Sequence, residues 1–406
     1  MHKISYERLY YILLIVYIFN QVLSESQFVN MDVTSKILSL VRYFIIVALI
    51  IFILNKNIKV KKQLIYTFII MISFIALNFI LVNGGISYIP IILFVLASKN
   101  FSLEKIFKYT LYTLIISHVT VMLGARIGIL HDMIDFRYVG QFSGNVLSGA
   151  YYRHNMGFLV HNQIALAYLI TYLYIIVIKR NRITNIENII LMILNYVVFK
   201  FFGSRIVFIL TILVCISFYA LKIFKQFQNH KIGHLWFLSY PLFAILSLTT
   251  AYLYNEKNNW WKIIDMIFNN RIRMASEAVK YYGVGLIGGG KDAGLYNSSS
   301  SINITVDNGY ISSLVSEGLI ITVVLIGIWM YLTYVADKKN NLYLLFVLIL
   351  LALENIINTH LGSFKLIPFF CILVNENDVF LNEDYCSLFM KHDMRRRSRL
   401  RMKIYR

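Results

Sequence analysis

Long apolar runs recur along the whole chain, and they constrain its fold more than any other feature. Many reach about 18 to 22 residues, the length that a helix needs to cross roughly 30 Å of hydrocarbon. Only three prolines and 20 glycines are spread over the 406 residues. Such runs suit helices and not the short alternating strands of a barrel. The sequence therefore predicts an all-α polytopic integral membrane protein, with residues 1–406 forming one transmembrane domain.

Composition agrees with this class, because 58% of the residues are hydrophobic and only 15% are charged, whereas soluble domains carry about a quarter charged residues. We interpret the first run as a retained span, since it lacks a small-residue cleavage site and many similar runs follow it. About twelve spans fit the pattern. Their expected ranges are 5–23, 38–54, 64–82, 86–98, 104–123, 157–178, 186–202, 204–224, 232–254, 309–335, 341–358 and 363–375.

The net charge of +19 is concentrated in alternate loops and in the tail at 376–406. The intervening loops are nearly balanced, as Glu25, Asp32 and Lys36 illustrate. Because basic loops stay in the cytoplasm, both termini are expected there. Attraction of the basic tail to anionic lipid headgroups is favoured over nucleic-acid binding, so no nucleic-acid partner is expected. Two long segments, about 124–156 and 255–308, then fall on the outer face.

The outer segment at 260–280 is expected to form a helix that lies on the outer leaflet. Asp265 belongs to the polar side of this helix, and Arg271 and Arg273 lie near its end. Two residues apart is roughly 200° around a helix, so we expect Arg271 to face the membrane and Arg273 to face solvent. Packing of this helix on other loops is the alternative. Its apolar face would consist of Trp260, Ile263, Ile264, Ile267 and Phe268, which follow helical spacing.

Common catalytic motifs are absent. Gly285 and Gly290-Lys291 have the spacing of a phosphate loop, but Asp292 stands where Ser or Thr is required and no strand precedes it. The chain has no HExxH, paired CxxC or GxSxG, and its three cysteines are scattered. We therefore expect no cofactor and no metal.

Charged and polar residues at the outer ends of spans remain as site candidates. Arg153 is followed by His154 and Asn155, and His161-Asn162 lies inside the next expected span. Polar residues at that depth are costly and often functional, although a hydrogen bond between helices explains His161-Asn162 equally well.

Arg205 follows Gly203-Ser204 at the start of a helix, where an interfacial anchor is the alternative to a functional role. Glu354 and Asn355 lie within an apolar run, and a structural hydrogen bond explains them as well as a role would. Asp307 precedes another expected span. Its carboxylate near several arginines could act as a general base, and the alternative is an ordinary helix N-cap.

Four segments taken together resemble the Wzy family of bacterial polysaccharide polymerases, within the wider O-antigen polymerase and ligase group. The resemblance covers about residues 137–325, and the first five spans match in kind only. The four segments are YYRHNMGFLVHNQIAL at 151–166, FFGSRIVFIL at 201–210, NNRIRMASEAVKYYGVGLIGGG at 269–290 and DNGYISSLVSEGLI at 307–320. The ligase branch usually has His where this chain has Asp307, which favours a polymerase.

The resemblance implies a glycosyltransferase in the bacterial plasma membrane that acts on undecaprenyl-diphosphate-linked oligosaccharide at the outer face, without a metal. It implies Arg205 and Arg271 as stabilisers of the diphosphate, Arg153 as a diphosphate or sugar ligand, and Asp307 as the base. Membrane lipids, a flippase and a chain-length regulator would be its partners. A ligase and a lipid-linked oligosaccharide flippase are the alternatives. The other substrate-binding candidates are Arg137, His154, Asn155, His161, Asn162, Asn308 and Tyr310.

Overall fold

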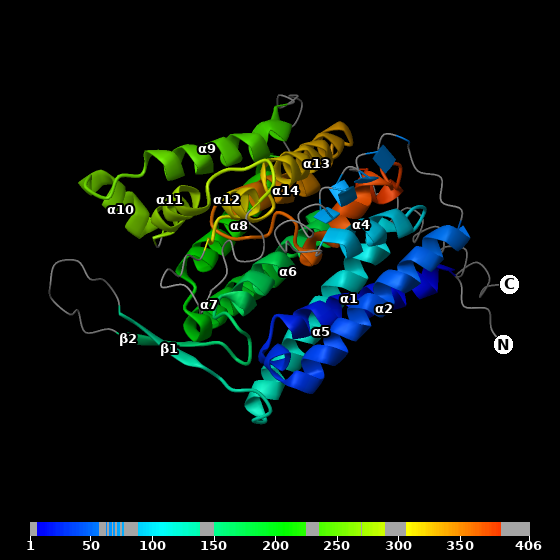
Figure 1. Ribbon diagram of the computed structural model, residues 1–406, viewed down its shortest axis with the longest axis horizontal. Coiled ribbons are helices and arrows are strands. Elements are labelled where there is room, and N and C mark those ends of the chain that lie inside the picture. The colour runs from blue at the N-terminus through cyan, green and yellow to red at the C-terminus, as the bar shows by residue number, and fades with distance from the viewer. Residues whose placement is uncertain are drawn as a thin grey trace, which may run out of the picture.

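A computed structural model describes residues 6–56, 62, 65–66, 68–69, 71–73, 75–76, 88–138, 150–224, 235–268, 270–288 and 306–382. Helices dominate, and their apolar composition produces a bundle (Figure 1). The helices are α1 (Tyr6–Ser24), α2 (Asp32–Lys56), α4 (Tyr88–Ala97), α5 (Leu103–Arg126), α6 (Gln163–Lys179), α7 (Asn185–Phe202), α8 (Arg205–Phe224), α9 (Ser239–Leu253), α10 (Asn259–Ile267), α11 (Arg271–Tyr282), α12 (Gly309–Ser316), α13 (Leu319–Lys338), α14 (Leu342–Glu354) and α15 (Ile367–Phe370).

Six helical segments in the described part of the chain are long and apolar enough to cross a membrane. The prediction of a helical membrane protein is therefore confirmed at this level. These segments are Asp32–Lys56, Leu103–Arg126, Gln163–Arg182, Asn185–Phe202, Trp236–Leu253 and Leu319–Lys338.

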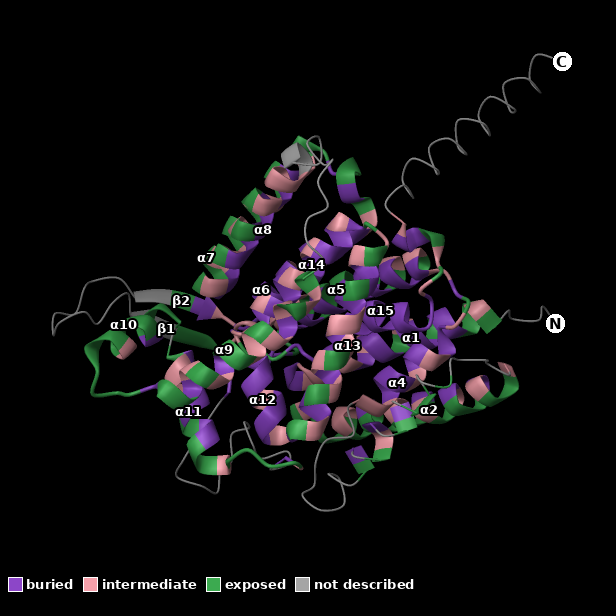
Figure 2. Ribbon diagram, turned by 90° about the horizontal axis from the view of Figure 1, so that it is seen from above, coloured by how far each residue is buried: buried purple, intermediate pink, exposed green. Residues whose placement is uncertain are grey.

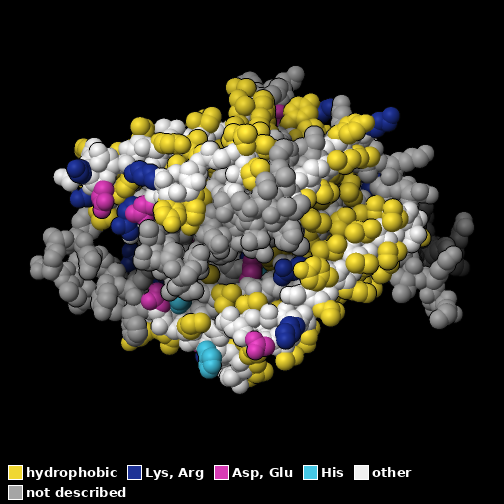
Figure 3. Space-filling model, in the orientation of Figure 1, with side chains coloured by type: hydrophobic (Ala, Val, Ile, Leu, Met, Phe, Trp, Pro, Cys, Tyr) yellow, Lys and Arg dark blue, Asp and Glu magenta, His cyan; other side chains and the backbone are white. Residues whose placement is uncertain are grey.

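Apolar side chains lie on the outside of the bundle as well as in its core. Leu40, Phe44 and Leu54 of α2 are 69%, 66% and 71% exposed, and hydrophobic side chains cover much of the right-hand part of the molecule in Figure 3. Buried residues face the centre of the bundle, whereas exposed ones lie on outer helices such as α2 and α7 (Figure 2). A protein in water rarely exposes so much apolar surface, so this surface indicates contact with lipid.

The interior is aromatic and joins helices that are distant in sequence. Trp329 of α13 is fully buried, stacks on Tyr240 of α9 and packs against Phe370 of α15. Its indole nitrogen donates a hydrogen bond to the carbonyl of Leu361 at 2.8 Å. This pairing satisfies the indole N–H, which would be costly to bury without a partner. These contacts hold α9 and α13 against α15.

A short antiparallel sheet departs from the all-α expectation. Strand β1 (Ile134–Tyr138) pairs with β2 (Ala150–His154) (Figure 1). In this register Asp135 lies opposite Arg153. Aromatic residues in both segments, together with Ile134 in β1, favour extended backbone. The outer segment predicted as a loop at 124–156 therefore carries a two-stranded sheet, which places Arg153 in a strand.

The expected span 309–335 is not one helix, because the chain breaks between α12 and α13. Gly318 has φ +92°, and a Cβ there would lie 2.6 Å from the nitrogen of Gly288. The segment at Gly285 packs directly against this break, since Leu319 N donates a hydrogen bond to Gly285 O at 2.9 Å. Only glycine allows this backbone geometry and close approach without strain. Gly285, one of the glycines with phosphate-loop spacing, thus serves backbone packing.

Three other expected elements differ from the structure. The sixth span begins at Gln163 rather than at 157, and the last run, 363–375, consists of short helical turns that include α15. Pro368 lies in the first turn of α15, where proline is tolerated because it lacks an N–H. The expected helix 260–280 is divided into α10 and α11, with Asn270 at φ +64° between them. By contrast, the expected spans 186–202 and 204–224 correspond to α7 and α8, and Gly203 at φ +60° ends α7 between them.

Candidate functional site

Arg271, the first residue of α11, forms an ion pair with Asp307, which lies just before α12. The Arg271 Nη2 atom lies 3.3 Å from Asp307 Oδ2. The Arg271 side chain is 6% exposed and the Asp307 side chain is 49% exposed. A buried guanidinium therefore meets a carboxylate that remains accessible. Such a pair can stabilise developing negative charge and accept a proton at adjacent positions.

Helix α11 is fixed at its start by Asp265. The Asp265 Oδ1 atom accepts hydrogen bonds from the backbone N–H groups of Ile272 and Arg273, both at 3.0 Å. Asp265 is buried, which corrects its assignment to the outer polar side of a single amphipathic helix. Since the first N–H groups of a helix lack partners within the helix, this carboxylate caps α11 and positions Arg271.

The neighbouring arginine lies in a different environment. Arg273 is 41% exposed and its Nε atom is 3.8 Å from Glu277. Arg271 was expected to face the membrane, but it is buried and pairs with Asp307. It begins a second helix, which packs on α9 and α12 through Ala275 and Ala278.

Asn308, and not Asp307, caps helix α12. Its Oδ1 atom accepts hydrogen bonds from the N–H groups of Tyr310 and Ile311, both at 3.1 Å. Its Nδ2 atom donates to Ser247 Oγ at 3.1 Å. The N-cap alternative for Asp307 is therefore wrong. Its carboxylate is left to pair with Arg271.

Contacts with the end of α14 hold the start of α12 in place. Gly309 N donates to Asn355 O at 2.7 Å, and the buried Tyr310 hydroxyl donates to Ala352 O at 2.8 Å. An added Cβ on Gly309 would lie 2.5 Å from Asn355 Oδ1. In this structure, Tyr310 and Asn308 make hydrogen bonds that fix the helix beside Asp307.

A second group of polar residues surrounds Arg153, which is buried in β2. Its Nη2 atom donates to Asn162 Oδ1 at 2.6 Å, and its Nε atom donates to Phe202 O at 3.2 Å. Phe202 ends α7, and the exposed Arg205 begins α8 three residues later. Arg153 and Asn162, both predicted as site components, are thus brought together beside the turn that precedes Arg205.

His154 pairs with a residue that the sequence reasoning missed. Its Nδ1 atom lies 2.6 Å from Asp132 Oδ2, and both side chains are partly exposed. Asp132 Oδ1 also accepts a hydrogen bond from Met156 N at 2.9 Å. A lone Asp before the strand gives no signal in sequence, because the contact depends on how the hairpin closes.

The remaining site candidates lie in the sheet or between the sheet and α6. Asn155 is buried, and its side chain bonds Met133 N and Phe158 O, which fixes the turn after β2. His161 is half-buried just before α6. The backbone of Arg137 pairs with Tyr151 in the sheet, and its side chain lies outside the described residues.

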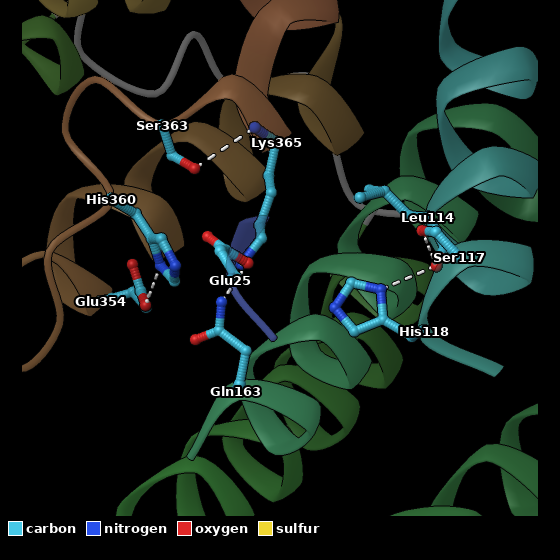
Figure 4. Close-up of polar contacts among 9 residues, drawn as sticks. All are labelled: Glu25, Leu114, Ser117, His118, Gln163, Glu354, His360, Ser363 and Lys365. Atoms are coloured by element: carbon cyan, nitrogen blue, oxygen red, sulfur yellow. Dashed lines mark hydrogen bonds and ion pairs between the residues drawn. The ribbon is translucent and has the colours of Figure 1, made fainter. Parts of the chain in front are cut away.

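Ionisable residues inside the bundle form two further pairs that were not predicted (Figure 4). Lys365 Nζ lies 2.8 Å from Glu25 Oε2, which also accepts a hydrogen bond from Gln163. His360 Nδ1 lies 2.7 Å from Glu354 Oε1, and both of these side chains are buried. Lys365 was detectable as a lone cation in an expected span, where charge is costly.

No group of three His, Cys, Asp or Glu side chains among the described residues could hold a metal ion. The described arrangement offers arginines for anionic oxygens and Asp307 for a proton. Comparison with protein-family models, with curated proteins and with solved structures found no match to this chain.

Proposed function

We propose that this chain polymerises undecaprenyl-diphosphate-linked oligosaccharide repeats at the outer leaflet of a bacterial plasma membrane. The observation that carries the proposal is the Arg271–Asp307 pair, in which a buried guanidinium meets a half-exposed carboxylate. The motif resemblance supports the same reaction, because both residues belong to its matched segments.

In this reaction, a hydroxyl oxygen of the incoming lipid-linked repeat attacks the anomeric carbon of the growing chain. The bond between that carbon and the diphosphate oxygen breaks, and undecaprenyl diphosphate leaves with its negative charge. Asp307 accepts the hydroxyl proton, and Arg271 stabilises the charge that develops on the leaving oxygen. Guanidinium groups suit this task because they bind phosphate oxygens bidentately and stay protonated.

Arg153 and Arg205 would contribute to diphosphate or sugar binding near the turn between α7 and α8. The proposal includes about twelve spans, with both termini in the cytoplasm and α10 on the outer leaflet. The exposed apolar side chains of α10, among them Trp260 at 74% and Ile267 at 69%, support an interfacial location. Cysteines introduced at positions 145 and 297 should react with an impermeant reagent in intact cells, and one at 181 should not. Reaction at 181 alone would show that the protein has the opposite orientation in the membrane.

A lipid-linked oligosaccharide transporter is the second candidate, and the ionisable residues of the bundle favour it. Lys365, Glu354 and His360 are buried, and Lys365 pairs with the partly exposed Glu25. Transporters place ion and substrate pathways among such residues. A ligase would share the chemistry of the polymerase but would transfer finished chains to another acceptor.

Reconstitution separates these candidates. Purified protein in liposomes should convert synthetic undecaprenyl-diphosphate repeats into a ladder of longer chains, with release of undecaprenyl diphosphate. Movement of the repeats between leaflets without chain growth would identify a transporter. Transfer only to an added non-repeat acceptor would identify a ligase. Either result would refute the polymerase proposal.

A further inference from the structure

An apolar groove lies between α5, α6 and α7. It has a volume of about 450 Å³, with His118 and Met122 on one wall, Phe202 on the other, and Ala167 and Thr171 of α6 between them. Ala167 and Thr171 of α6 have small side chains and lie in the floor of the groove, beside the larger Ile164 and Tyr168. A second groove of about 330 Å³ lies between α7 and α8 and serves below as a comparison.

The groove has the length of one membrane leaflet. Its residues on α5 run from Leu114 to Arg126, a rise of about 18 Å at 1.5 Å per residue. The hydrocarbon of a bilayer is about 30 Å thick, so the groove spans roughly half of it. It therefore matches a hydrocarbon chain that enters from one side of the membrane.

Positive charge lies at one end of this groove. Arg126 lines it where α5 ends, and no described carboxylate pairs with this arginine. Phe202 lines the same region, and its carbonyl accepts the hydrogen bond from Arg153. The described residues that line the α7–α8 groove include no Arg or Lys. Only the first groove thus combines an apolar channel with guanidinium groups near its end.

We infer that this groove binds the polyprenyl tail of a lipid diphosphate, with the diphosphate held by Arg126 and Arg153. The identification of the lipid as a polyprenyl diphosphate rests on the proposed function. The apolar groove with positive charge at one end is a feature of the structure. Arg126 can bind a phosphate bidentately, and Arg153, whose Nε and Nη2 atoms donate to Phe202 O and Asn162 Oδ1, adds a second positive charge nearby. Two positive charges complement a diphosphate better than they complement the single phosphate of a phospholipid. The groove would thereby position the lipid-linked substrate by its tail.

Photo-crosslinking tests this directly. Benzoylphenylalanine replaces Met122 in the groove or Ile193 in the comparison groove, in liposomes of phosphatidylethanolamine, phosphatidylglycerol and undecaprenyl diphosphate. The variant at 122 should give an undecaprenyl diphosphate adduct, and the variant at 193 should give phospholipid adducts. Phospholipid adducts alone at 122, or equal undecaprenyl diphosphate adducts at both sites, would overturn the inference.

Two substitutions with matched controls extend the test. Arg126→Gln should weaken undecaprenyl diphosphate crosslinking and raise KM for the lipid-linked repeat about tenfold at unchanged kcat, as expected for one lost charge-assisted hydrogen bond. Thr171→Phe should block the groove, whereas Ile193→Phe should not. Normal crosslinking and KM in both groove variants would overturn the inference and leave the polymerase proposal intact. An adduct at 122 in a protein that forms no polymer would instead refute only the proposed function.

Discussion

Asp307 and Asn308 are adjacent, yet the structure gives them separate roles that substitution can distinguish. Asp307→Asn removes the carboxylate but leaves an amide that can still accept a hydrogen bond from Arg271. It does not touch the helix cap, because Asn308 caps α12. Asn308→Ala removes the cap and leaves the Arg271–Asp307 pair in place.

The expected magnitudes separate the two variants. Loss of a general base costs about 10²–10⁴ in rate, which corresponds to roughly 3–5 kcal/mol in the barrier. The Asp307 side chain is 49% exposed, so solvent screening limits the stabilising effect of its ion pair to about 1 kcal/mol or less. Asn308→Ala loses the hydrogen bonds to Tyr310 N and Ile311 N and leaves the Ser247 hydroxyl without this donor. The cap loss costs about 1–2 kcal/mol of folding stability.

The assay measures the initial rate of chain growth per folded protein, together with the thermal midpoint in the same detergent. Asp307→Asn should lose nearly all of the rate and keep its midpoint. Asn308→Ala should lower the midpoint and keep most of the rate at a temperature where it is folded. A near-normal rate for Asp307→Asn would show that Asp307 is not the base. If both variants lost rate and thermal midpoint to the same extent, Asp307 and Asn308 would both have only a structural role.

Two further comparisons use neighbouring or matched residues. Arg271→Lys should reduce the rate of chain growth about tenfold or more, because lysine cannot bind phosphate oxygens bidentately. Arg273→Lys should change the rate by no more than about twofold, since Arg273 is exposed. Equal rates in the two variants would show that Arg271 has only a structural role. Gly128→Ala, at φ +83° with no atom near the added Cβ, should cost about 1–2 kcal/mol of folding stability through backbone strain. Gly318→Ala should cost more, because its Cβ would also meet backbone at 2.6 Å. Thermal unfolding of both variants checks the order, and a milder effect at Gly318 would contradict the packing at the helix break.

The sequence alone determined the class of the protein and several local features. A long apolar run that crosses a membrane must pair its backbone N–H and C=O groups within the protein, and a helix does this within the run itself. Helices therefore follow from the composition and length of the runs. The expected spans 186–202 and 204–224 leave only Gly203 between them, so the turn between α7 and α8 follows from the sequence, since glycine adopts left-handed backbone without strain. Helical geometry also predicted that Arg271 and Arg273 point in different directions, but not that Arg271 is buried beside Asp307.

Tertiary structure decided which polar residues meet. The approach of Arg271 to Asp307, and of Lys365 to Glu25, depends on how distant helices pack, which local periodicity does not encode. Asn308 and Asp307 are both good N-caps by residue type, and the contact of Asn308 with Ser247 of α9 accompanies its role as the cap. The break at Gly318 likewise depends on the segment at Gly285 lying against it. Local sequence therefore specified helices and turns, while long-range packing specified the site.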